Sequence, residues 1–321
     1  MSVLIAFLSL ALEAKLGYPD RLFAWIGHPV TWIGRLISCL DTALNRATDS
    51  DRTRRLCGIV ALTAIVGVPT LVAYGLERML LAHALGVVAV IALATTLLAQ
   101  KSLADHVEAV ASALDDGGLA AGREAVSRIV GRDPETLDGA AVSRAAIESL
   151  AENFSDGVVA PAFWIAVGGL AGGVAYKAAN TADSMIGHRT PRHEAFGWAA
   201  ARFDDLINLP ASRLTAVLIV VAAAILPGMD ARAAWRSVWR DAGKHRSPNA
   251  GWPEAAMAGA LGIALAGPRS YGGVMGDYAF MGEGGRRDVT AADIRRALRL
   301  FWTADLLLIA LLAVAALALL A

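Results

Sequence analysis

Residues 57–76 read CGIVALTAIVGVPTLVAYGL and contain no charged side chain. A second uncharged run, MLLAHALGVVAVIALATTLLA, follows at 79–99, and only Glu77 and Arg78 separate the two runs. Because about 20 apolar residues in a helix cross the roughly 30 Å of hydrocarbon in a bilayer, each run has the length of a transmembrane helix. The pattern predicts a tight transmembrane hairpin that turns at Glu77 and Arg78.

The composition of the whole chain also indicates a lipid environment. Of 321 residues, 56% are hydrophobic and only 18% are charged, and the mean hydropathy is +0.51, which exceeds what a soluble protein of this size needs. The formal net charge is zero, so no excess of one sign indicates a nucleic-acid partner. Cys39 and Cys57 are too few and too isolated for a disulfide framework or a zinc site. We expect an all-α, polytopic membrane bundle that forms a single catalytic domain over residues 1–321.

The remaining apolar segments are less regular. Residues 158–176 are uncharged but contain Pro161 and two Gly-Gly pairs, so this segment is expected to span the membrane, to kink, or to re-enter from one side. Residues 306–321 form an apolar run that is expected to enter the membrane at Asp305. The N-terminal run, MSVLIAFLSLAL, lacks the basic start and the cleavage site of a signal peptide, so we expect it to be part of the fold.

Residues 101–157 are the least membrane-like part of the chain and predict a mainly cytoplasmic helical insertion. Its helices are expected to break at the Asp-Asp-Gly-Gly run 115–118 and at GRDPETL, where Asp133 would cap a helix. Basic residues place the long loops on either side of the hairpin in the cytoplasm. Around 206–226, basic residues both precede and follow the apolar run. Either this region re-enters the membrane from one side, or the rule that basic loops are cytoplasmic does not hold there.

Three acidic residues recur at helical spacing in IESLAENFSDG. Glu148, Glu152 and Asp156 stand four residues apart, with Asn153 beside them, so a helix would carry them as one stripe that ends at Gly157. Like charges at this spacing repel one another, and a solvated helix end is the simpler interpretation. A binding or catalytic site is the alternative.

A second polar stripe follows the apolar run, in YKAANTADSMIGHR. It combines a cation, an amide, a carboxylate and a hydroxyl on one face of a continuing helix. These residues are Lys177, Asn180, Asp183 and Ser184. Ionisable groups at membrane depth tend to be functional, but Lys177 could also reach the interface and simply pair with Asp183.

Two adjacent carboxylates, Asp204 and Asp205, precede the apolar run LTAVLIVVAAAIL. Arg202 and Asn208 share the adjoining faces of the same predicted helix. Adjacent aspartates cost free energy unless a positive group lies beside them, and the candidates are the protein's own arginines or a divalent cation. Because Mg²⁺ takes one or two carboxylates and completes its shell with waters and phosphates, the pattern favours a phosphate-bearing substrate.

The stretch GKHRSPNAGWPE combines basic residues with a turn and a helix start. Its polar residues include Lys244, His245, Arg246, Ser247, Asn249 and Glu254. Cations beside the N-terminus of a helix predict an anion site, and a basic loop that contacts lipid head groups is the alternative. The glycine-rich segment GPRSYGGVMGDY at 267–278 matches neither the P-loop pattern nor the dinucleotide fingerprint.

Six motifs follow one another along the chain. They are GHPVTWIGRLI, ESLAENFSDGVVAPAFW, YKAANTADSMIGHR, FGWAAARFDDLINLPASRL, SPNAGWPEAAMAGAL and SYGG. In this order they closely resemble the CobD/CbiB family, the membrane-bound adenosylcobinamide-phosphate synthases of cobalamin biosynthesis. The resemblance extends from about Leu12 to about Gly273. It departs at EAKLGYPDRL, 13–22, where the first helix of the family ends in an aspartate-bearing turn.

The resemblance implies a multi-pass enzyme of the cell (inner) membrane. Such an enzyme joins (R)-1-aminopropan-2-ol, free or as its O-phosphate, to the free propionate carboxylate of adenosylcobyric acid at the expense of ATP. The carboxylate must be activated, and Mg²⁺ together with cationic side chains would neutralise the transferred phosphoryl group. The expected metal ligands are then Asp156, Asp183 and Asp205.

Other residues receive roles from the same resemblance. The expected catalytic residues are Glu148, Glu152, Asp204, Asp205 and Glu254, with His245 as a further candidate base. The expected substrate-binding residues are Asn153, Lys177, Asn180, Ser184, Arg202, Asn208, Arg213, Lys244, Arg246, Ser247 and Asn249. Mg²⁺ is the expected cofactor, ATP is the expected co-substrate, and the expected partners are the corrinoid, the lipid bilayer and other late enzymes of the cobalamin pathway.

Two other classes of function fit the same residues. An intramembrane prenyltransferase would place Asp- and Asn-rich motifs at helix ends to hold a magnesium diphosphate, and it would need a long apolar tunnel. A transporter or regulator without catalysis would use intramembrane charges and broken helices. It would bind a ligand without converting it.

Overall fold

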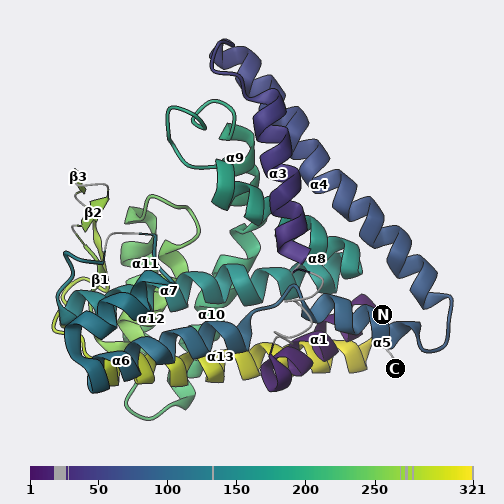
Figure 1. The fold of residues 1–321 in the computed structure, drawn as a ribbon. Helices are drawn as coiled ribbons and strands as arrows, with labels where there is room; N and C mark the ends of the chain where they lie inside the picture. Colours follow the sequence, from purple (N-terminus) through teal and green to yellow (C-terminus); the bar gives the residue numbers. More distant parts are fainter. Residues whose placement is uncertain are drawn as a thin grey trace. The chain divides into compact units, whose positions relative to one another are not determined.

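The computed structural model describes the chain except for residues 18–26, 28, 132–133, 268, 272–273, 277 and 320–321. The chain folds into two compact units, and most of their helices and strands are labelled in Figure 1. Unit 1 comprises Met1–Ala99, Ala160–Asn208 and Leu312–Ala321, and unit 2 comprises Gln100–Val159 and Leu209–Leu311. The expected single domain over 1–321 stays a prediction.

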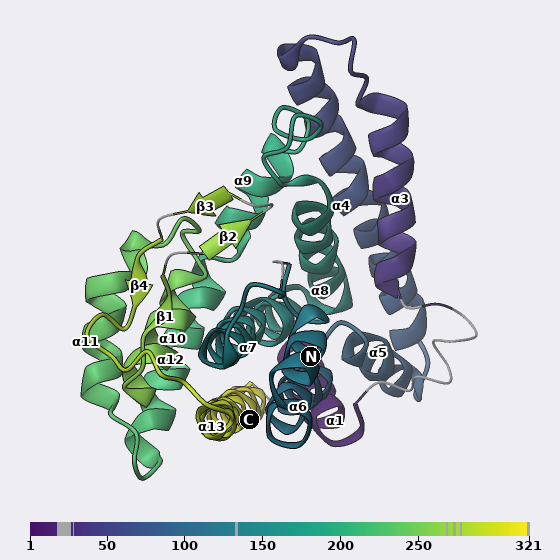
Figure 2. The same cartoon turned by 60° about the vertical axis from the view of Figure 1, so that its left-hand side comes forward.

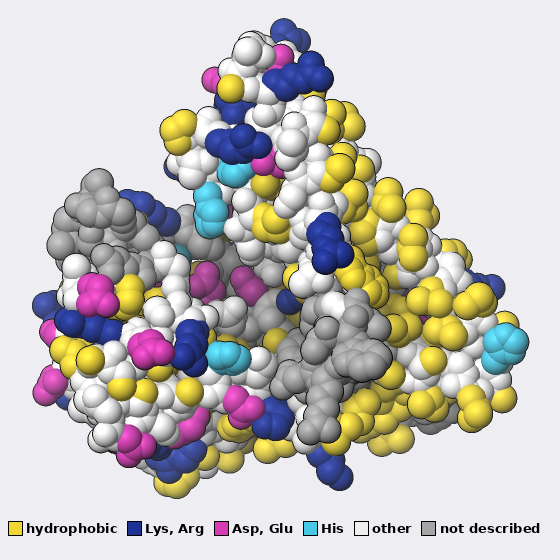
Figure 3. All heavy atoms as spheres, in the orientation of Figure 1, with side chains coloured by type: hydrophobic (Ala, Val, Ile, Leu, Met, Phe, Trp, Pro, Cys, Tyr) yellow, Lys and Arg dark blue, Asp and Glu magenta, His cyan; other side chains and the backbone are white. Residues whose placement is uncertain are grey.

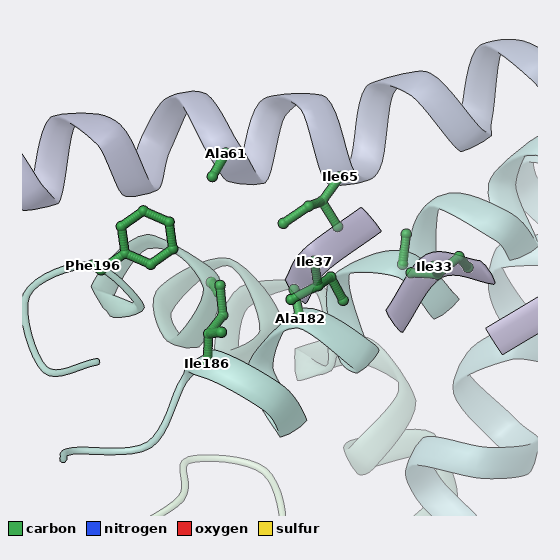
Figure 4. Packing of buried hydrophobic residues seen from close by; sticks show 9 residues of the cluster. Ile33, Ile37, Ala61, Ile65, Ala182, Ile186 and Phe196 are labelled. Atoms are coloured by element: carbon green, nitrogen blue, oxygen red, sulfur yellow. The ribbon is translucent and has the colours of Figure 1, made fainter. Parts of the chain in front are cut away.

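Unit 1 consists of α-helices that pack around an aliphatic core. Its helices are α1 (Ser2–Leu16), α3 (Pro29–Leu44), α4 (Asp51–Leu81), α5 (Gly86–Thr95), α8 (Ala160–Ile186) and α9 (Trp198–Ile207). In the core, Ile37 of α3 and Ile65 of α4 pack with Ile186 of α8 and with Phe196, which precedes α9 (Figure 4). Alanines on the same surfaces let the helices approach closely. As expected, the N-terminal run belongs to the fold, because α1 buries Ile5.

The expected hairpin turn at Glu77 and Arg78 is wrong. Both residues lie inside α4, and the chain leaves the helix only at 82–85. Glu77 is buried, and its carboxylate accepts the backbone N–H of Ala171 in α8 at 3.5 Å, so a partner on another helix lets the charge lie within an apolar helix. The outward face of α4 carries exposed apolar side chains such as Leu71, which suits contact with lipid (Figure 3).

The glycines in the middle of α8 produce a kink, one of the expected outcomes for this segment. Gly168 and Gly169 have non-helical backbone angles, with φ at +64° for Gly169, and the helix then resumes to Ile186. A Cβ atom at Gly169 would overlap the carboxylate of Glu77. The glycine at the kink of α8 therefore leaves the space that the carboxylate of Glu77 in α4 occupies.

We expect Gly169→Ala to destabilise unit 1 by roughly 2–4 kcal/mol, because alanine would need a backbone conformation that almost only glycine adopts and would displace Glu77. Gly75→Ala in α4 is the matched control. A Cβ there meets no atom within 4 Å, and alanine is the better helix former. Thermal melting in detergent measures both variants, and equal midpoints would contradict the contact between Glu77 and the kink.

Unit 2 combines helices with two short antiparallel strand pairs (Figure 2). Its helical elements are α6 (Gln100–Ser127), α7 (Gly139–Phe154), the π-helical turn η1 (Ser155–Val159), α10 (Leu209–Ile225), α11 (Ala231–Asp241), the 3-10 turn η2 (Ala242–Lys244), α12 (Gly251–Leu261) and most of α13 (Ala291–Ala318). Strands β1 (Leu265–Ala266) and β4 (Phe280–Met281) pair with each other, as do β2 (Arg269–Tyr271) and β3 (Val274–Gly276). The rings of Phe154 and Phe301 meet edge to face at 4.9 Å between centroids and join α7 to α13.

The last apolar helix begins well before Asp305, and its expected entry into the membrane at that residue stays a prediction. Asp305 is fully buried within α13, which begins at Ala291. The residues before it form the same helix, because Ile294, Ala297 and Phe301 recur at helical spacing and are buried against the rest of unit 2. The polar residues between these buried positions therefore lie on another face of the same helix, and they do not form a loop.

The breaks expected within 101–157 are found only in part. The run 115–118 coincides with a kink at Gly118, whose φ is +69° inside α6. Asp133 lies outside the described residues, and α7 is capped by Asp138, whose carboxylate accepts the N–H of Ala141 at 2.7 Å. Gly157 does not end the acidic stripe with a turn, as expected, but lies within η1.

The described residues are helical apart from loops and four short strands, which confirms the predicted all-α class. Four helical stretches among them are long and apolar enough to cross a membrane. They are Asp51–Leu81, Gly86–Ser127, Gly139–Ile186 and Ala291–Ala318. α9 and α10, with Asn208 between them, would add a fifth if they form one broken span. These helices fit a multi-pass membrane protein.

Candidate functional site

Unit 1 brings one group of the predicted site residues together. α8 continues as a helix beyond its kink, as expected, and carries Asn180 and Asp183 in its last turns. α9 carries Asp204 and Asp205, and Asn208 directly follows this helix. We call these five residues the aspartate cluster.

A chain of hydrogen bonds holds Asp204 in place. Tyr176 Oη donates to Asn208 Oδ1 at 2.9 Å, and Asn208 Nδ2 donates to Asp204 Oδ2 at 2.9 Å. Asn180 Nδ2 reaches the other carboxylate oxygen, Oδ1, at 3.4 Å. Asp204 is only 8% exposed, and Tyr176 and Asn208 are buried. Side-chain amides therefore satisfy both oxygens of this carboxylate.

The carboxylates of the aspartate cluster repel one another, and cations offset part of this repulsion. Arg202 pairs with Asp205 at 3.6 Å, one turn along α9, and Arg189 also attracts that carboxylate. A Cβ atom at Gly187 would overlap Asp183 Oδ1, so glycine leaves the room that this carboxylate occupies. The cluster is a preorganised acidic site that suits a cationic ligand or a metal-bound phosphate.

The other predicted residues on α8 lie close to the cluster in sequence. Ser184 is exposed, and its hydroxyl donates to the backbone carbonyl of Asn180 at 2.9 Å. Lys177 is half-buried one turn before Asn180. The predicted shared face of α8 therefore exists, and the binding roles of Lys177 and Ser184 stay predictions.

No three His, Cys, Asp or Glu side chains among the described residues lie close enough together to hold a metal ion by themselves. Asp183 and Asp205 belong to unit 1, whereas Asp156 belongs to unit 2. Their expected common role as metal ligands stays a prediction.

Arg213 and Asn249 form a second group, in unit 2. Arg213 Nη1 donates to Asn249 Oδ1 at 2.8 Å and to Ser212 Oγ at 2.9 Å. Its guanidinium carbon lies 4.5 Å from the centroid of the Trp252 ring. Stacking and hydrogen bonding together fix the cation in one orientation, which is what the recognition of a planar anion requires.

The turn before α12 places a histidine beside an acid. His245 Nε2 lies 3.7 Å from Glu254 Oε1, and Glu254 is buried in the first turn of α12. The N–H of Ser247 donates to His245 Nδ1 at 3.0 Å, and Ser247 Oγ accepts the N–H groups of Asn249 and Ala250. The backbone therefore orients the imidazole ring, and the carboxylate of Glu254 lies beside it at ion-pair distance.

Lys244 and Arg246 both contact neighbouring side chains. Lys244 Nζ donates to Asp241 Oδ1 at 3.1 Å and to Glu283 Oε2 at 2.8 Å. Arg246 Nη1 donates to Tyr278 Oη at 2.9 Å, and its guanidinium carbon lies 4.2 Å from the centre of that ring. An anionic ligand would compete with these internal partners for the two cations.

Asp241 is fully buried and accepts hydrogen bonds from several donors. Arg240 donates to it through Nε and Nη2 at 2.8 and 2.6 Å, and the N–H groups of Gly282 and Glu283 donate at 3.0 and 3.1 Å. Burial alone would raise the pKa of Asp241, but these donors and Lys244 outweigh it and hold the pKa below its ordinary value of 3.8. The carboxylate therefore stabilises the fold above that pH, and this contribution is lost as the pH falls further.

We expect Asp241→Asn to lower the stability of unit 2 by about 3 kcal/mol at neutral pH, because it leaves buried donors facing a neutral group. The difference from the wild type should shrink as the pH falls below 3.8, where the wild-type carboxylate itself becomes protonated. Thermal midpoints in one detergent, taken from about pH 7 to about pH 3, measure this. A difference that stays constant with pH would show that Asp241 acts through packing alone.

The acidic stripe of α7 does not present three equivalent carboxylates. Glu148 is buried, and its Oε1 accepts the N–H of Ala266 at 2.9 Å, which fixes β1. Glu152 and Asn153 are exposed, and Asn153 Nδ2 donates to the carbonyl of Ser149 at 2.9 Å. The catalytic and binding roles expected for this stripe stay predictions.

Several partners of the predicted residues were not assigned roles from the sequence, among them Tyr176, Ser212, Asp241 and Trp252. Each of these four stands three or four positions from a predicted residue, for example Tyr176 from Asn180 and Asp241 from Lys244. The contacts of Tyr176 with Asn208 and of Ser212 with Asn249 join residues far apart in sequence, so helical spacing alone does not reveal them.

The family model described as CobD/Cbib protein matches residues 6–301, which include both groups of site residues. The chain belongs to the CobD/CbiB family. Its similarity to individual family members is also extensive, and no solved structure gives a significant match to it.

Three similar proteins are each named cobalamin biosynthesis protein CobD. The one from Rhizobium meliloti (strain 1021) is 52% identical over 304 residues, which cover 94% of this chain and 93% of that protein. The one from Brucella suis biovar 1 (strain 1330) is 48% identical over 306 residues, with 94% and 93% covered. The one from Rhodobacter capsulatus is 48% identical over 294 residues, with 91% and 90% covered. Together they support a role of this CobD/CbiB family member in cobalamin biosynthesis.

Proposed function

We propose that this CobD/CbiB family member is an adenosylcobinamide-phosphate synthase of the inner membrane. It joins the amine of (R)-1-aminopropan-2-ol, free or as its O-phosphate, to the free propionate carboxylate of adenosylcobyric acid, with ATP as co-substrate. The observation that supports this most is the aspartate cluster, a preorganised acidic site in a chain that belongs to a cobalamin-biosynthesis family. Association with other late enzymes of the pathway belongs to the same proposal.

The aspartate cluster fits the Mg²⁺ that this reaction implies. Mg²⁺ prefers oxygen ligands and takes one or two carboxylates together with waters and substrate phosphates. Asp183 and Asp205 are both partly exposed and would hold the ion, which supplies neutralising charge for the phosphates of ATP. Asp204 is held by amides on both oxygens and keeps the neighbouring carboxylate in position.

The groups of unit 2 supply the remaining chemistry in this proposal. A carboxylate becomes an acyl donor once it is activated, most simply as its acyl phosphate, and Arg213 binds an anionic group through the orientation that Trp252 and Asn249 give it. The ammonium of the amino alcohol must lose a proton before it attacks. Glu254, whose Oε1 faces His245 Nε2 at 3.7 Å, accepts that proton, because His245 Nδ1 already accepts the N–H of Ser247.

A single assay tests this reaction against the two other classes of function. The purified full-length chain in detergent is incubated with adenosylcobyric acid, aminopropanol phosphate, ATP and Mg²⁺, and the amide product is sought by mass spectrometry. Product that requires both ATP and Mg²⁺ supports the proposal. Binding of the corrinoid without product would instead favour a transporter or regulator.

A prenyltransferase is the second alternative function, because such an enzyme needs apolar space for its substrate and unit 1 contains an apolar cavity. Its volume is about 320 Å³, and its lining includes Trp32, Val72 and Leu170. A parallel incubation with a prenyl diphosphate and Mg²⁺ distinguishes the two enzymes. Release of diphosphate there, without amide formation in the first assay, would overturn the proposed reaction.

A further inference from the structure

Unit 2 contains a cavity of about 230 Å³ between α11, α12 and the glycine-rich loop 282–285. Its polar lining comes from Arg236, Ser237 and Arg240 on α11 and from the loop backbone. None of the site residues predicted from the sequence lines it. The cavity is therefore separate from the groups around Arg213 and His245 described above.

Three hydrogen-bond donors at this cavity lack a partner within the described part of the chain. Arg236 is exposed, and its guanidinium takes part in no ion pair or hydrogen bond there. Ser237 is only 5% exposed, yet its hydroxyl has no partner, although a helical serine commonly bonds to the carbonyl four residues earlier. The N–H of Gly284 is the third donor. Arg236 and Gly284 are exposed, so these donors are available to a ligand that accepts hydrogen bonds.

The loop is held open by an internal anion and by its glycines. The carboxylate of Asp241 accepts the N–H groups of Gly282 and Glu283 and fixes the guanidinium of Arg240 beside the cavity. Gly282 and Gly284 have φ at +75° and +83°, a conformation that favours glycine. Three of the four loop residues that line the cavity are glycines, whose backbone is not covered by a side chain of their own.

The charges at the cavity favour an anion. Arg236 carries a positive charge that no acid of the described residues neutralises, and Arg240 is shared with Asp241. Glu283 also lines the cavity, but its carboxylate pairs with Lys244 at 2.8 Å. The charged residues that line the cavity, Arg236, Arg240 and Glu283, have a net positive charge. Each hydrogen bond from a donor at the cavity to an oxyanion would be charge-assisted.

We propose that this cavity binds a phosphate group, which accepts hydrogen bonds from the guanidinium of Arg236, the hydroxyl of Ser237 and the N–H of Gly284. The phosphate belongs to a soluble phosphate compound or to a phospholipid head group. Trp235 and Trp239 on α11 are exposed, and tryptophan is typical of a membrane interface. A lipid head group is therefore tested as a source beside a soluble phosphate. The inference goes beyond the proposed amide synthesis, because binding is measured without turnover.

Isothermal titration of the full-length chain in detergent with inorganic pyrophosphate tests the soluble source. We expect saturable binding by the wild type, roughly tenfold or greater loss of affinity in Arg236→Gln, and a smaller loss in Ser237→Ala. Arg232→Gln is the matched control, because Arg232 lies one turn earlier on α11, is exposed and does not line the cavity. It should bind like the wild type. Circular dichroism confirms that each variant is folded.

Native mass spectrometry of the same variants in phosphatidylglycerol nanodiscs tests the lipid source. Retention of phosphatidylglycerol by the wild type and by Arg232→Gln, but not by Arg236→Gln, assigns the cavity to a lipid head group. Loss of pyrophosphate binding in Arg236→Gln alone assigns it to a soluble phosphate. If the Arg236 and Arg232 variants behave alike in both experiments, the cavity is not a phosphate site.

Discussion

Asp205→Asn is expected to reduce ATP-dependent amide formation by roughly 10²–10³-fold. Asparagine keeps the size of the side chain but removes the negative charge, so the site loses one of the two partly exposed carboxylates proposed for Mg²⁺. It also leaves Arg202, which lies 3.6 Å from this carboxylate, without its acidic partner. The rate of product formation, followed by mass spectrometry at several Mg²⁺ concentrations, measures the effect. A weakened metal site should also raise the Mg²⁺ concentration that gives half-maximal rate.

Asp105→Asn is the matched control for this charge change. Asp105 is exposed on α6 and pairs with Lys101 at 2.8 Å, and exposed pairs of this kind contribute little to stability. The control variant should therefore keep the wild-type rate and Mg²⁺ requirement. If Asp205→Asn also keeps both, Asp205 has no part in the reaction and the metal assignment loses one of its ligands.

The spacing of polar residues predicted the local geometry of the site well. Asn180 and Asp183 share the last turns of a continuing helix, and Asn208 bonds to Asp204 four residues earlier. Such neighbours follow from the helical repeat alone. The partner that completes the network, Tyr176, reaches Asn208 across 32 positions of sequence. The helical repeat within one segment cannot predict a contact between two segments. This contact is therefore seen only in the packing of α8 against the end of α9.

Helix boundaries at charged residues were predicted less well. Glu77 lies between two apolar runs and Asp305 precedes another, so the sequence predicts a turn at the first residue and a membrane entry at the second. In the structure both are buried inside helices, and Glu77 accepts an N–H at the kink of α8. Glu77 can lie inside a helix because its hydrogen-bond partner, Ala171, comes from a segment 94 positions away, which no pattern around Glu77 predicts.

Asn208→Ala is expected to destabilise unit 1 by roughly 2–4 kcal/mol, because it removes hydrogen bonds from two buried groups at once. Tyr176 Oη loses its acceptor, and Asp204 Oδ2 loses its amide donor. Tyr176→Phe should cost less, about 1–2 kcal/mol, since it leaves one buried oxygen of Asn208 without a donor. Thermal melting in detergent measures both. Tyr74→Phe is the control, because Tyr74 is exposed on α4 and its substitution should leave the midpoint unchanged.

The double variant of Tyr176 and Asn208 decides whether the two residues act as one chain. If the tyrosine acts only through Asn208, adding Tyr176→Phe to Asn208→Ala should cost no further stability. The released Asp204 should at the same time lower kcat more than it raises KM in the amide assay, because the carboxylate positions its neighbours and does not bind substrate directly. Additive losses of stability would instead mean that Tyr176 contributes through separate packing, and the hydrogen-bonded chain would then not be what orders the aspartate cluster.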